Sequence, residues 1–185
     1  MTLLILVSGP PAAGKTSLAE PVAAELGLPL LAKDRIKEAL FDSLGTGDRD
    51  WSSRLSRATY AVLFALASAQ DAAVLEANFD PPTREGISEL CDRPIEVFVT
   101  APEEEIVRRF TERERHSGHL DDSPDAVERV REAARRGPLD LGGPLLVLDS
   151  SLKELDAGEV VAWIRSLPEW CDAHATGRTS AEHRQ

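Results

Sequence analysis

A glycine-rich segment directly behind a short apolar run places the strongest constraint on how this 185-residue chain folds. The apolar run is Leu3-Leu4-Ile5-Leu6-Val7, and after Ser8 the chain reads Gly9-Pro10-Pro11-Ala12-Ala13-Gly14-Lys15-Thr16, which fits the pattern G-x-x-x-x-G-K-[ST]. The run predicts a buried strand, and the pattern predicts a tight loop that opens a helix at about Gly14. We therefore expect a strand, a loop and a helix in direct succession.

The same segment has the residues of a phosphate-binding loop. Glycine at both ends lets the backbone wrap around a polyanion and point successive N–H groups at its oxygens, where a Cβ would intrude. We expect Lys15 to reach the β- and γ-phosphates of ATP, and Thr16 to offer its hydroxyl to Mg²⁺. The helix that follows aims its positive end at the same charge. The predicted ATP-binding residues are Gly9, Pro10, Pro11, Ala12, Ala13, Gly14, Lys15, Thr16 and Ser17.

The rest of the chain alternates short apolar runs with longer helical patterns. This alternation predicts an α/β fold in which helices cover both faces of a parallel sheet. Between Trp51 and Gln70, apolar residues at three- and four-residue spacing predict a mostly buried helix packed on the sheet; they are Leu55, Ala58, Val62, Ala65 and Ala69. The candidate strands are Leu3–Ser8, Leu28–Ala32, Ala73–Ala77, Ile95–Thr100 and Leu145–Leu148.

The composition limits the classes of partner and compartment. The length suits one domain, expected over residues 1–170, and the polar segment 171–185 is expected to be a flexible tail. A net charge of −11 opposes general binding to nucleic acid or to an anionic membrane.

Cys91 and Cys171 lack metal-type spacing, so we expect neither a disulfide framework nor a zinc site, and a reducing cytoplasm fits best. No apolar run is long enough to span a bilayer, and residues 3–7 do not resemble a signal peptide.

Polar residues just after the strands are the next candidates, because ligands of open α/β sheets lie beyond the carboxyl ends of the strands. Asp34 follows the second strand and would accept a proton from an acceptor hydroxyl or hold the water shell of the metal; alternatively, it caps the next helix. Glu76 ends a buried strand and would assist the metal; alternatively, it marks where the strand emerges into solvent. Asn78 lies just beyond and is expected to line the acceptor pocket.

Four arginines follow the fourth strand in a predicted helix after Thr100, namely Arg108, Arg109, Arg113 and Arg115. The spacing of Arg109 and Arg113 places these two on one helix face. Guanidinium groups on a mobile lid would stabilise charge that develops during phosphoryl transfer. The alternative is a solvated helix face whose arginines pair with neighbouring glutamates.

The order of these elements resembles the small P-loop kinases grouped with chloramphenicol phosphotransferase, zeta toxins and the kinase domain of polynucleotide kinase, which carry an AAA-type ATP-binding domain. The resemblance implies a three-layer fold with five parallel strands in the order 2-3-1-4-5. It also implies that Asp34 is the catalytic base, and that Arg35 and Lys37 flank the acceptor site. The arginines at 109 and 113 match a lid motif of that family, which implies a lid around residues 109–122.

A second part of the predicted lid, from Arg115 to His119, is similar to the lid of uncharacterised bacterial members of that family. The two histidines in it, His116 and His119, have no third ligand nearby, so we assign no metal to them.

The predicted function is an ATP-dependent, Mg²⁺-requiring kinase that phosphorylates a hydroxyl of a small molecule. Lys15, Asp34, Arg109 and Arg113 would be catalytic, and Thr16 and Glu76 would organise the metal. One alternative is a nucleotide-dependent regulatory module, although the chain lacks the Asn-Lys-x-Asp segment of GTPases and the Leu-Ser-Gly-Gly segment of ABC proteins. A nucleic-acid end kinase is a further alternative, which the acidity of the chain opposes. The sequence implies neither a particular acceptor nor an oligomeric state.

Overall fold

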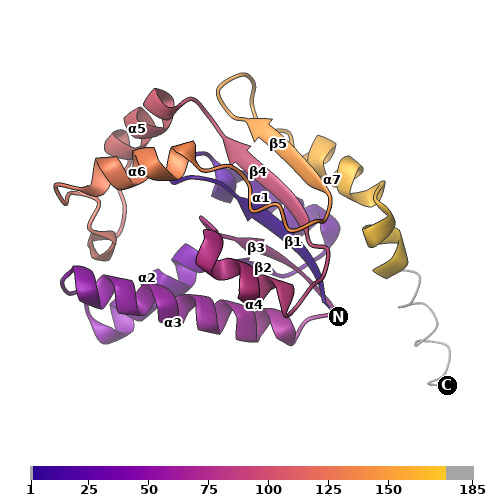
Figure 1. Ribbon diagram of the computed structural model, residues 1–185, viewed down its shortest axis with the longest axis horizontal. Helices are drawn as coiled ribbons and strands as arrows, with labels where there is room; N and C mark the ends of the chain where they lie inside the picture. Colours follow the sequence, from indigo (N-terminus) through magenta and orange to yellow (C-terminus); the bar gives the residue numbers. More distant parts are fainter. Residues whose placement is uncertain (1, 174–185) are drawn as a thin grey trace.

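The computed structural model of the protein describes residues 2–173, and residues 1 and 174–185 lie outside the described part. Its centre is a sheet of five parallel strands in the order β2-β3-β1-β4-β5 (Figure 1), which confirms the predicted α/β class and strand order. The strands are β1 (Leu3–Ser8), β2 (Leu30–Ala32), β3 (Ala72–Glu76), β4 (Ile95–Thr100) and β5 (Leu145–Asp149).

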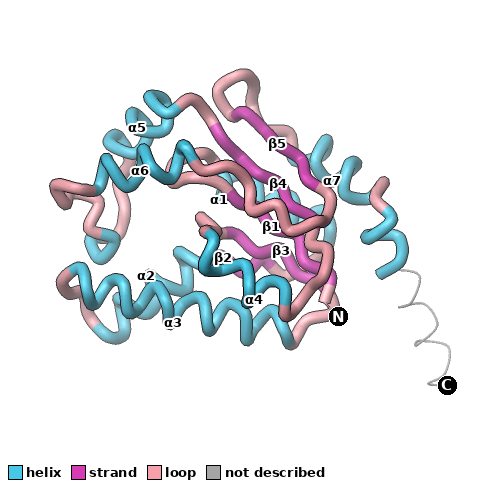
Figure 2. The backbone as a smooth tube through the Cα atoms, viewed as in Figure 1, coloured by secondary structure: helices cyan, strands magenta, loops and turns pink. Residues whose placement is uncertain are grey.

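Helices follow the strands along the chain and surround the sheet (Figure 2). The first three are α1 (Lys15–Leu26), α2 (Lys33–Leu44) and α3 (Arg49–Ser68). The others are α4 (Arg84–Ser88), α5 (Glu103–Glu112), α6 (Ala126–Arg135) and α7 (Ala157–Arg165), and two short 3₁₀ turns are η1 (Pro81–Thr83) and η2 (Ser117–His119).

The side chains of β1 alternate between two hydrophobic cores, because successive residues of a strand point to opposite faces. Leu3, Ile5 and Val7 belong to a core that includes residues of α1, α5, α6 and α7. Leu4 and Leu6 belong to a second core with residues of α3 and α4. The fold therefore has three layers, and the fully buried β1 in the middle of the sheet gives the loop that follows it a rigid base.

The helix α3 is less buried than its apolar pattern predicts. Val62 and Leu66 are 41% and 44% exposed, and Ala58, Ala65 and Ala69 are exposed as well. The buried face consists of residues four apart, namely Leu55, Thr59, Leu63 and Ala67. The prediction of a mostly buried helix was wrong, because α3 lies on the outside of the fold and only one of its apolar stripes contacts the sheet.

The end of the described chain also differs from expectation. Residues 168–173 form a short helix, so residues 171–173, predicted as part of a flexible polar tail, are helical. The remainder of that predicted tail, residues 174–185, lies outside the described residues. Within residues 2–173, no helix has the length and apolar character required to cross a membrane.

Candidate active site

The predicted phosphate loop connects the carboxyl end of β1 with the start of α1. Its backbone has positive φ at Gly9 (136°), Ala12 (63°) and Gly14 (95°). Gly9 packs against β4 so closely that a Cβ there would lie 2.0 Å from the carbonyl oxygen of Val99. Gly14 is the N-cap residue of α1 in a left-handed conformation. The two glycines of the motif therefore occupy positions that residues with side chains rarely adopt.

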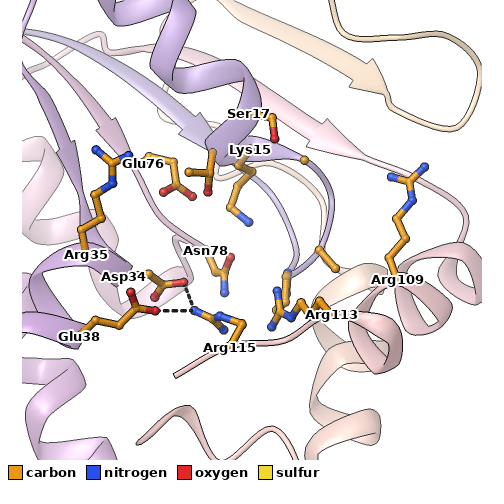
Figure 3. Close-up of a pocket in the computed structure, with 14 residues that line it drawn as sticks. Lys15, Ser17, Asp34, Arg35, Glu38, Glu76, Asn78, Arg109, Arg113 and Arg115 are labelled. Carbon is orange, nitrogen blue, oxygen red and sulfur yellow. Dashed lines mark hydrogen bonds and ion pairs between the residues drawn. The ribbon is translucent and has the colours of Figure 1, made fainter. Parts of the chain in front are cut away.

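A cavity of about 460 Å³, which we call the phosphate cavity, opens beside this loop (Figure 3). Six residues of the predicted ATP-binding set line it, namely Pro11, Ala12, Gly14, Lys15, Thr16 and Ser17. Gly9, Pro10 and Ala13 do not line the cavity: all three are buried, and Ala13 belongs to the hydrophobic core. The cavity also brings together the predicted residues Asp34, Arg35, Glu76, Asn78, Arg109 and Arg113.

Lys15 is buried at the base of the phosphate cavity. Its Nζ donates a hydrogen bond to the carbonyl oxygen of Pro10 at 2.7 Å, which keeps the side chain folded over the loop. Burial lowers the pKa of Lys15 to about 8, while the charges of Glu76 and Asp34 oppose this shift. A bound polyanion would stabilise the charged ammonium in the same way.

Glu76 and Thr16 place two oxygen-bearing side chains in the phosphate cavity with Lys15. Glu76 is 4% exposed, and burial raises the pKa of its carboxyl group although the nearby Lys15 ammonium opposes the shift. The nearby Thr16 hydroxyl also opposes this rise in the pKa of Glu76. Because Glu76 stays buried at the strand end, it does not mark an exit into solvent. A hydroxyl and a carboxylate are hard oxygen donors, so the pair fits Mg²⁺, which often takes only one or two protein ligands besides phosphates and water.

Asp34 lies in the first turn of α2 and is not its N-cap residue, which is Ala32. Its Oδ2 accepts a hydrogen bond from Arg115 Nη2 at 2.5 Å, and its Oδ1 accepts one from Lys33 Nζ at 3.2 Å. Burial alone would raise the pKa of Asp34, but the charges of Lys33 and Arg115 outweigh it and hold the pKa well below its usual range. Asp34 is therefore a carboxylate at neutral pH and a hydrogen-bond acceptor.

The helix α5 ends earlier than the arginine pattern predicts. It stops at Glu112, so Arg113 is its C-cap residue and Arg115 lies in the loop beyond. Both side chains nevertheless line the phosphate cavity, opposite Asp34 and Glu38 in Figure 3. Arg113 donates a hydrogen bond to Asp121 at 3.0 Å, and its buried Nε has no partner in the described part of the chain.

Arg109 lines the same cavity farther from Asp34 (Figure 3). Its Nε donates a hydrogen bond to Glu105 Oε1 at 2.7 Å. This agrees with the alternative prediction, in which the arginines of this helix pair with neighbouring glutamates. Its Nη1 donates to the hydroxyl of Ser150 at 2.8 Å, just after β5. Arg109 thus forms an ion pair with Glu105 and at the same time lines the phosphate cavity.

The loop between α5 and α6 packs on α2 through its histidines. His116 stacks on Phe41 with 5.3 Å between ring centroids, and its Nε2 lies 3.3 Å from Asp42. His119 Nε2 lies 2.8 Å from Glu38 Oε1. These contacts hold the predicted lid, residues 109–122, against α2 at the edge of the phosphate cavity.

Lys37 is the one predicted acceptor residue that does not line the phosphate cavity. It lies one turn beyond Asp34 on α2, is 6% exposed, and lines a second cavity. Lys37 and Arg35 are two residues apart on α2, which places their side chains on nearly opposite faces of the helix, and the structure therefore does not bring Lys37 into the cavity that Arg35 lines.

A protein-family model described as an AAA domain matches residues 4–137. The chain belongs to the AAA domain family. A comparison with curated proteins found no match to it. The solved structures that resemble this AAA domain protein include a candidate kinase from Chloroflexus aurantiacus, which is 37% identical to it in sequence and has a TM-score of 0.80. The match covers 89% of this chain and 97% of the Chloroflexus chain.

More distant structures share the fold at 18% identity. A sugar kinase from Janibacter sp. HTCC2649 has a TM-score of 0.59 and covers 94% of this chain and 96% of that one. Shikimate kinase from Acinetobacter baumannii has a TM-score of 0.56, and the match covers 100% of this chain and 96% of the shikimate kinase chain. The AAA domain protein thus has the fold of the P-loop kinases, which the motif and element order predicted.

Glu38 lines the cavity but was not predicted as a site residue, and Arg115, which was named among the lid arginines, was not predicted to contact Asp34. Arg115 reaches Asp34 from a loop that has no periodic pattern, so no spacing rule could place it there. Glu38 lies four residues beyond Asp34, and this helical spacing was the available signal. The AAA domain protein therefore surrounds Asp34 with more charge than its strand ends alone indicate.

Proposed function

We propose that the protein is an ATP-dependent kinase that transfers the γ-phosphate to a hydroxyl group of a small molecule. The observation that carries this proposal is one cavity that contains both the phosphate loop and the ionised, partly accessible Asp34. The resemblance to structures named as sugar, shikimate and gluconate kinases supports a small-molecule acceptor.

The phosphate loop and Lys15 would bind the triphosphate. Lys15 already lies folded over the loop, and a phosphate oxygen would replace the carbonyl of Pro10 as its partner. Thr16 and Glu76 would hold Mg²⁺, which, when bound, neutralises charge on the phosphates. The N-terminus of α1 faces the same position and adds its dipole.

Asp34 would bind the acceptor hydroxyl and orient its oxygen toward the γ-phosphorus. A carboxylate with a strongly lowered pKa is a weak base, and its main contribution is therefore position. This is sufficient for phosphoryl transfer, because the transition state is loose and the proton leaves late. Asn78 and Arg35, which line the same cavity, would contact the acceptor or the phosphates.

Residues 109–122 would act as a lid whose arginines stabilise the transferring phosphate. Arg113 lines the phosphate cavity, so its guanidinium group would contact a phosphate oxygen. Arg109 would reach the triphosphate from the other end of the cavity. Guanidinium groups in such positions stabilise charge on the equatorial and leaving oxygens.

The test is a screen for acceptor-dependent ADP release with sugars, sugar acids, nucleosides, antibiotics and oligonucleotide ends. The wild type should release ADP with at least one small-molecule class and yield a new phosphate ester, whereas Lys15→Ala should be inactive with every acceptor. ATP hydrolysis that no acceptor stimulates would contradict the proposal and favour a regulatory NTPase.

A further inference from the structure

A second cavity of about 280 Å³, which we call the basic cavity, lies between α2, α3 and the start of α6. Three positively charged side chains line it, one from each helix: Lys37, Arg49 and Arg129. Among the described residues that line it, Asp125 supplies the one carboxylate. In a chain with a net charge of −11, three cations gathered around one carboxylate indicate a site for an anion.

Lys37 is the most informative of these residues. Its side chain is 6% exposed, and its Nζ donates one hydrogen bond, to the hydroxyl of Ser52 at 3.0 Å. No carboxylate within residues 2–173 forms an ion pair with it. An ammonium group has three donors, and Nζ contacts two neutral groups, the Ser52 hydroxyl and the ring of Phe41 at 5.2 Å from its centroid, so the buried charge is costly to keep. Lys37 therefore has both the charge and the free donors to bind an anionic group.

The two arginines add to this excess of positive charge. Arg129 Nη1 lies 2.5 Å from Asp125 Oδ2, and Arg49 pairs with the same oxygen. One carboxylate thus neutralises at most one of the two guanidinium groups. A fourth basic side chain nearby, His119, lies against Glu38, and burial and the charge of Arg115 lower its pKa.

A small cavity of about 140 Å³ has lining residues in common with the phosphate cavity and with the basic cavity. It shares Asp34, Asn78 and Arg115 with the phosphate cavity, and it shares His119 and Arg129 with the basic cavity. Asp34 and Lys37 are three residues apart on α2, which places them on one helix face with about 5–6 Å between their Cβ atoms. One small molecule is therefore long enough to contact both.

We propose that the acceptor is an anionic small molecule, whose carboxylate or phosphate binds Lys37 and Arg129 in the basic cavity while its hydroxyl lies at Asp34. This inference rests on the proposed kinase function and names the substrate class. In the reaction, the hydroxyl oxygen bonds to the γ-phosphorus, the bond from that phosphorus to the β–γ bridging oxygen breaks, ADP leaves, and the hydroxyl proton passes to Asp34 and then to solvent. Lys37 and Arg129 set specificity and take no part in bond making.

The first experiment measures anion binding directly. The protein is saturated with Mg²⁺ and a non-hydrolysable ATP analogue so that the phosphate loop is filled, and inorganic phosphate or acetate is then titrated and followed by NMR. We expect at least one probe to bind the wild type, and Lys37→Met to weaken that binding by about tenfold or more. The stronger probe shows whether the site prefers phosphate or carboxylate.

Lys153→Met is the matched control, because Lys153 is an exposed lysine that pairs with Glu159 and lines neither the basic cavity nor the phosphate cavity. Its anion affinity should equal that of the wild type. Absence of binding by both probes, or equal affinity in Lys37→Met, would overturn the inference. If the wild type fails to bind the ATP analogue at all, the proposed kinase function fails instead, so the two failures are distinguishable.

The second experiment compares acceptors that differ mainly in charge. Glucose is the neutral member of the first set, gluconate its carboxylated form and glucose 6-phosphate its phosphorylated form, and equivalent sets are made from other polyols. We expect ADP release with charged members and at least about tenfold lower kcat/KM for their neutral counterparts. In Lys37→Met this preference should disappear, whereas affinity for the ATP analogue should stay the same. A neutral acceptor that is phosphorylated as well as its charged counterpart would contradict the proposal.

Discussion

Arg115 Nη2 donates a hydrogen bond to Asp34 Oδ2 at 2.5 Å and so joins the loop after α5 to the first turn of α2. The contact crosses the phosphate cavity and, together with Lys33, keeps Asp34 ionised. It also occupies one of the two carboxylate oxygens that an acceptor hydroxyl would approach. Asp34 thus has a fixed position and a fixed charge before any ligand binds.

The first prediction concerns Asp34 itself. Asp34→Asn removes the negative charge but retains the shape, so the acceptor hydroxyl loses its acceptor and its orientation. We expect kcat to fall by about 10²- to 10⁴-fold, whereas the affinity for MgATP stays within about twofold of the wild type. Steady-state kinetics and calorimetric titration measure the two quantities. Full activity in this variant would show that Asp34 has no catalytic role.

Removing Arg115 should change the titration of Asp34. In Arg115→Met, one of the cations that lower the pKa of Asp34 is lost, so this pKa should rise toward its usual range. The shift is measured by NMR of the carboxyl carbon as a function of pH. Arg108→Met is the control, because Arg108 pairs with Glu105 and Glu112 and does not contact Asp34. An unchanged pKa of Asp34 in Arg115→Met would show that the ion pair does not form in solution.

Gly9 should be essential for the fold around the phosphate loop. Gly9→Ala places a Cβ 2.0 Å from the Val99 carbonyl oxygen at a φ of 136°. We expect the free energy of unfolding to fall by about 3 kcal/mol or more, from the sum of steric overlap and backbone strain. Gly137→Ala is the control, because nothing lies within 4 Å of a Cβ there. Denaturant unfolding compares the two, and similar small losses in both would contradict this packing.

Stability should depend on pH through Lys37. Burial lowers its pKa to about 8 in the folded state, from about 10.5 when unfolded. Between these values the unfolded chain binds more protons, so wild-type stability rises with pH. Below pH 8 the wild type bears the full cost of the buried charge, and Lys37→Met should be more stable by about 1–3 kcal/mol at pH 7 in anion-free buffer. This advantage should shrink toward pH 10.5. A variant that is less stable at pH 7 would show that Lys37 is already well paired.

Much of the fold could be predicted from local sequence. The bounds of β1 and β4 match the predicted residues, because each is an apolar run that ends at a clear turn or helix signal. The outer face of α3 could not be predicted, since alanine, valine and leucine occur on both of its sides. Only the buried stripe with Leu55 and Leu63 contacts the sheet, and this choice depends on tertiary packing.

The candidate site was predictable where it is built from strand ends. Asp34, Glu76 and Asn78 come together because parallel strands end at one edge of the sheet. Arg115 was named among the lid arginines, but its contact with Asp34 could not be predicted, because a non-repetitive loop carries it across the cavity. The basic cavity was missed because Lys37, Arg49 and Arg129 come from three different helices, and only their packing brings them together.

The central claim is that the loop from Gly9 to Thr16 binds the triphosphate of MgATP, and calorimetric titration tests it most directly. Wild-type protein should release heat with a stoichiometry of one nucleotide per chain. Lys15→Met should bind MgATP at least about tenfold more weakly, because a charge-assisted contact to phosphate is lost. No binding to the wild type at millimolar MgATP, or equal affinity in the two proteins, would contradict the account.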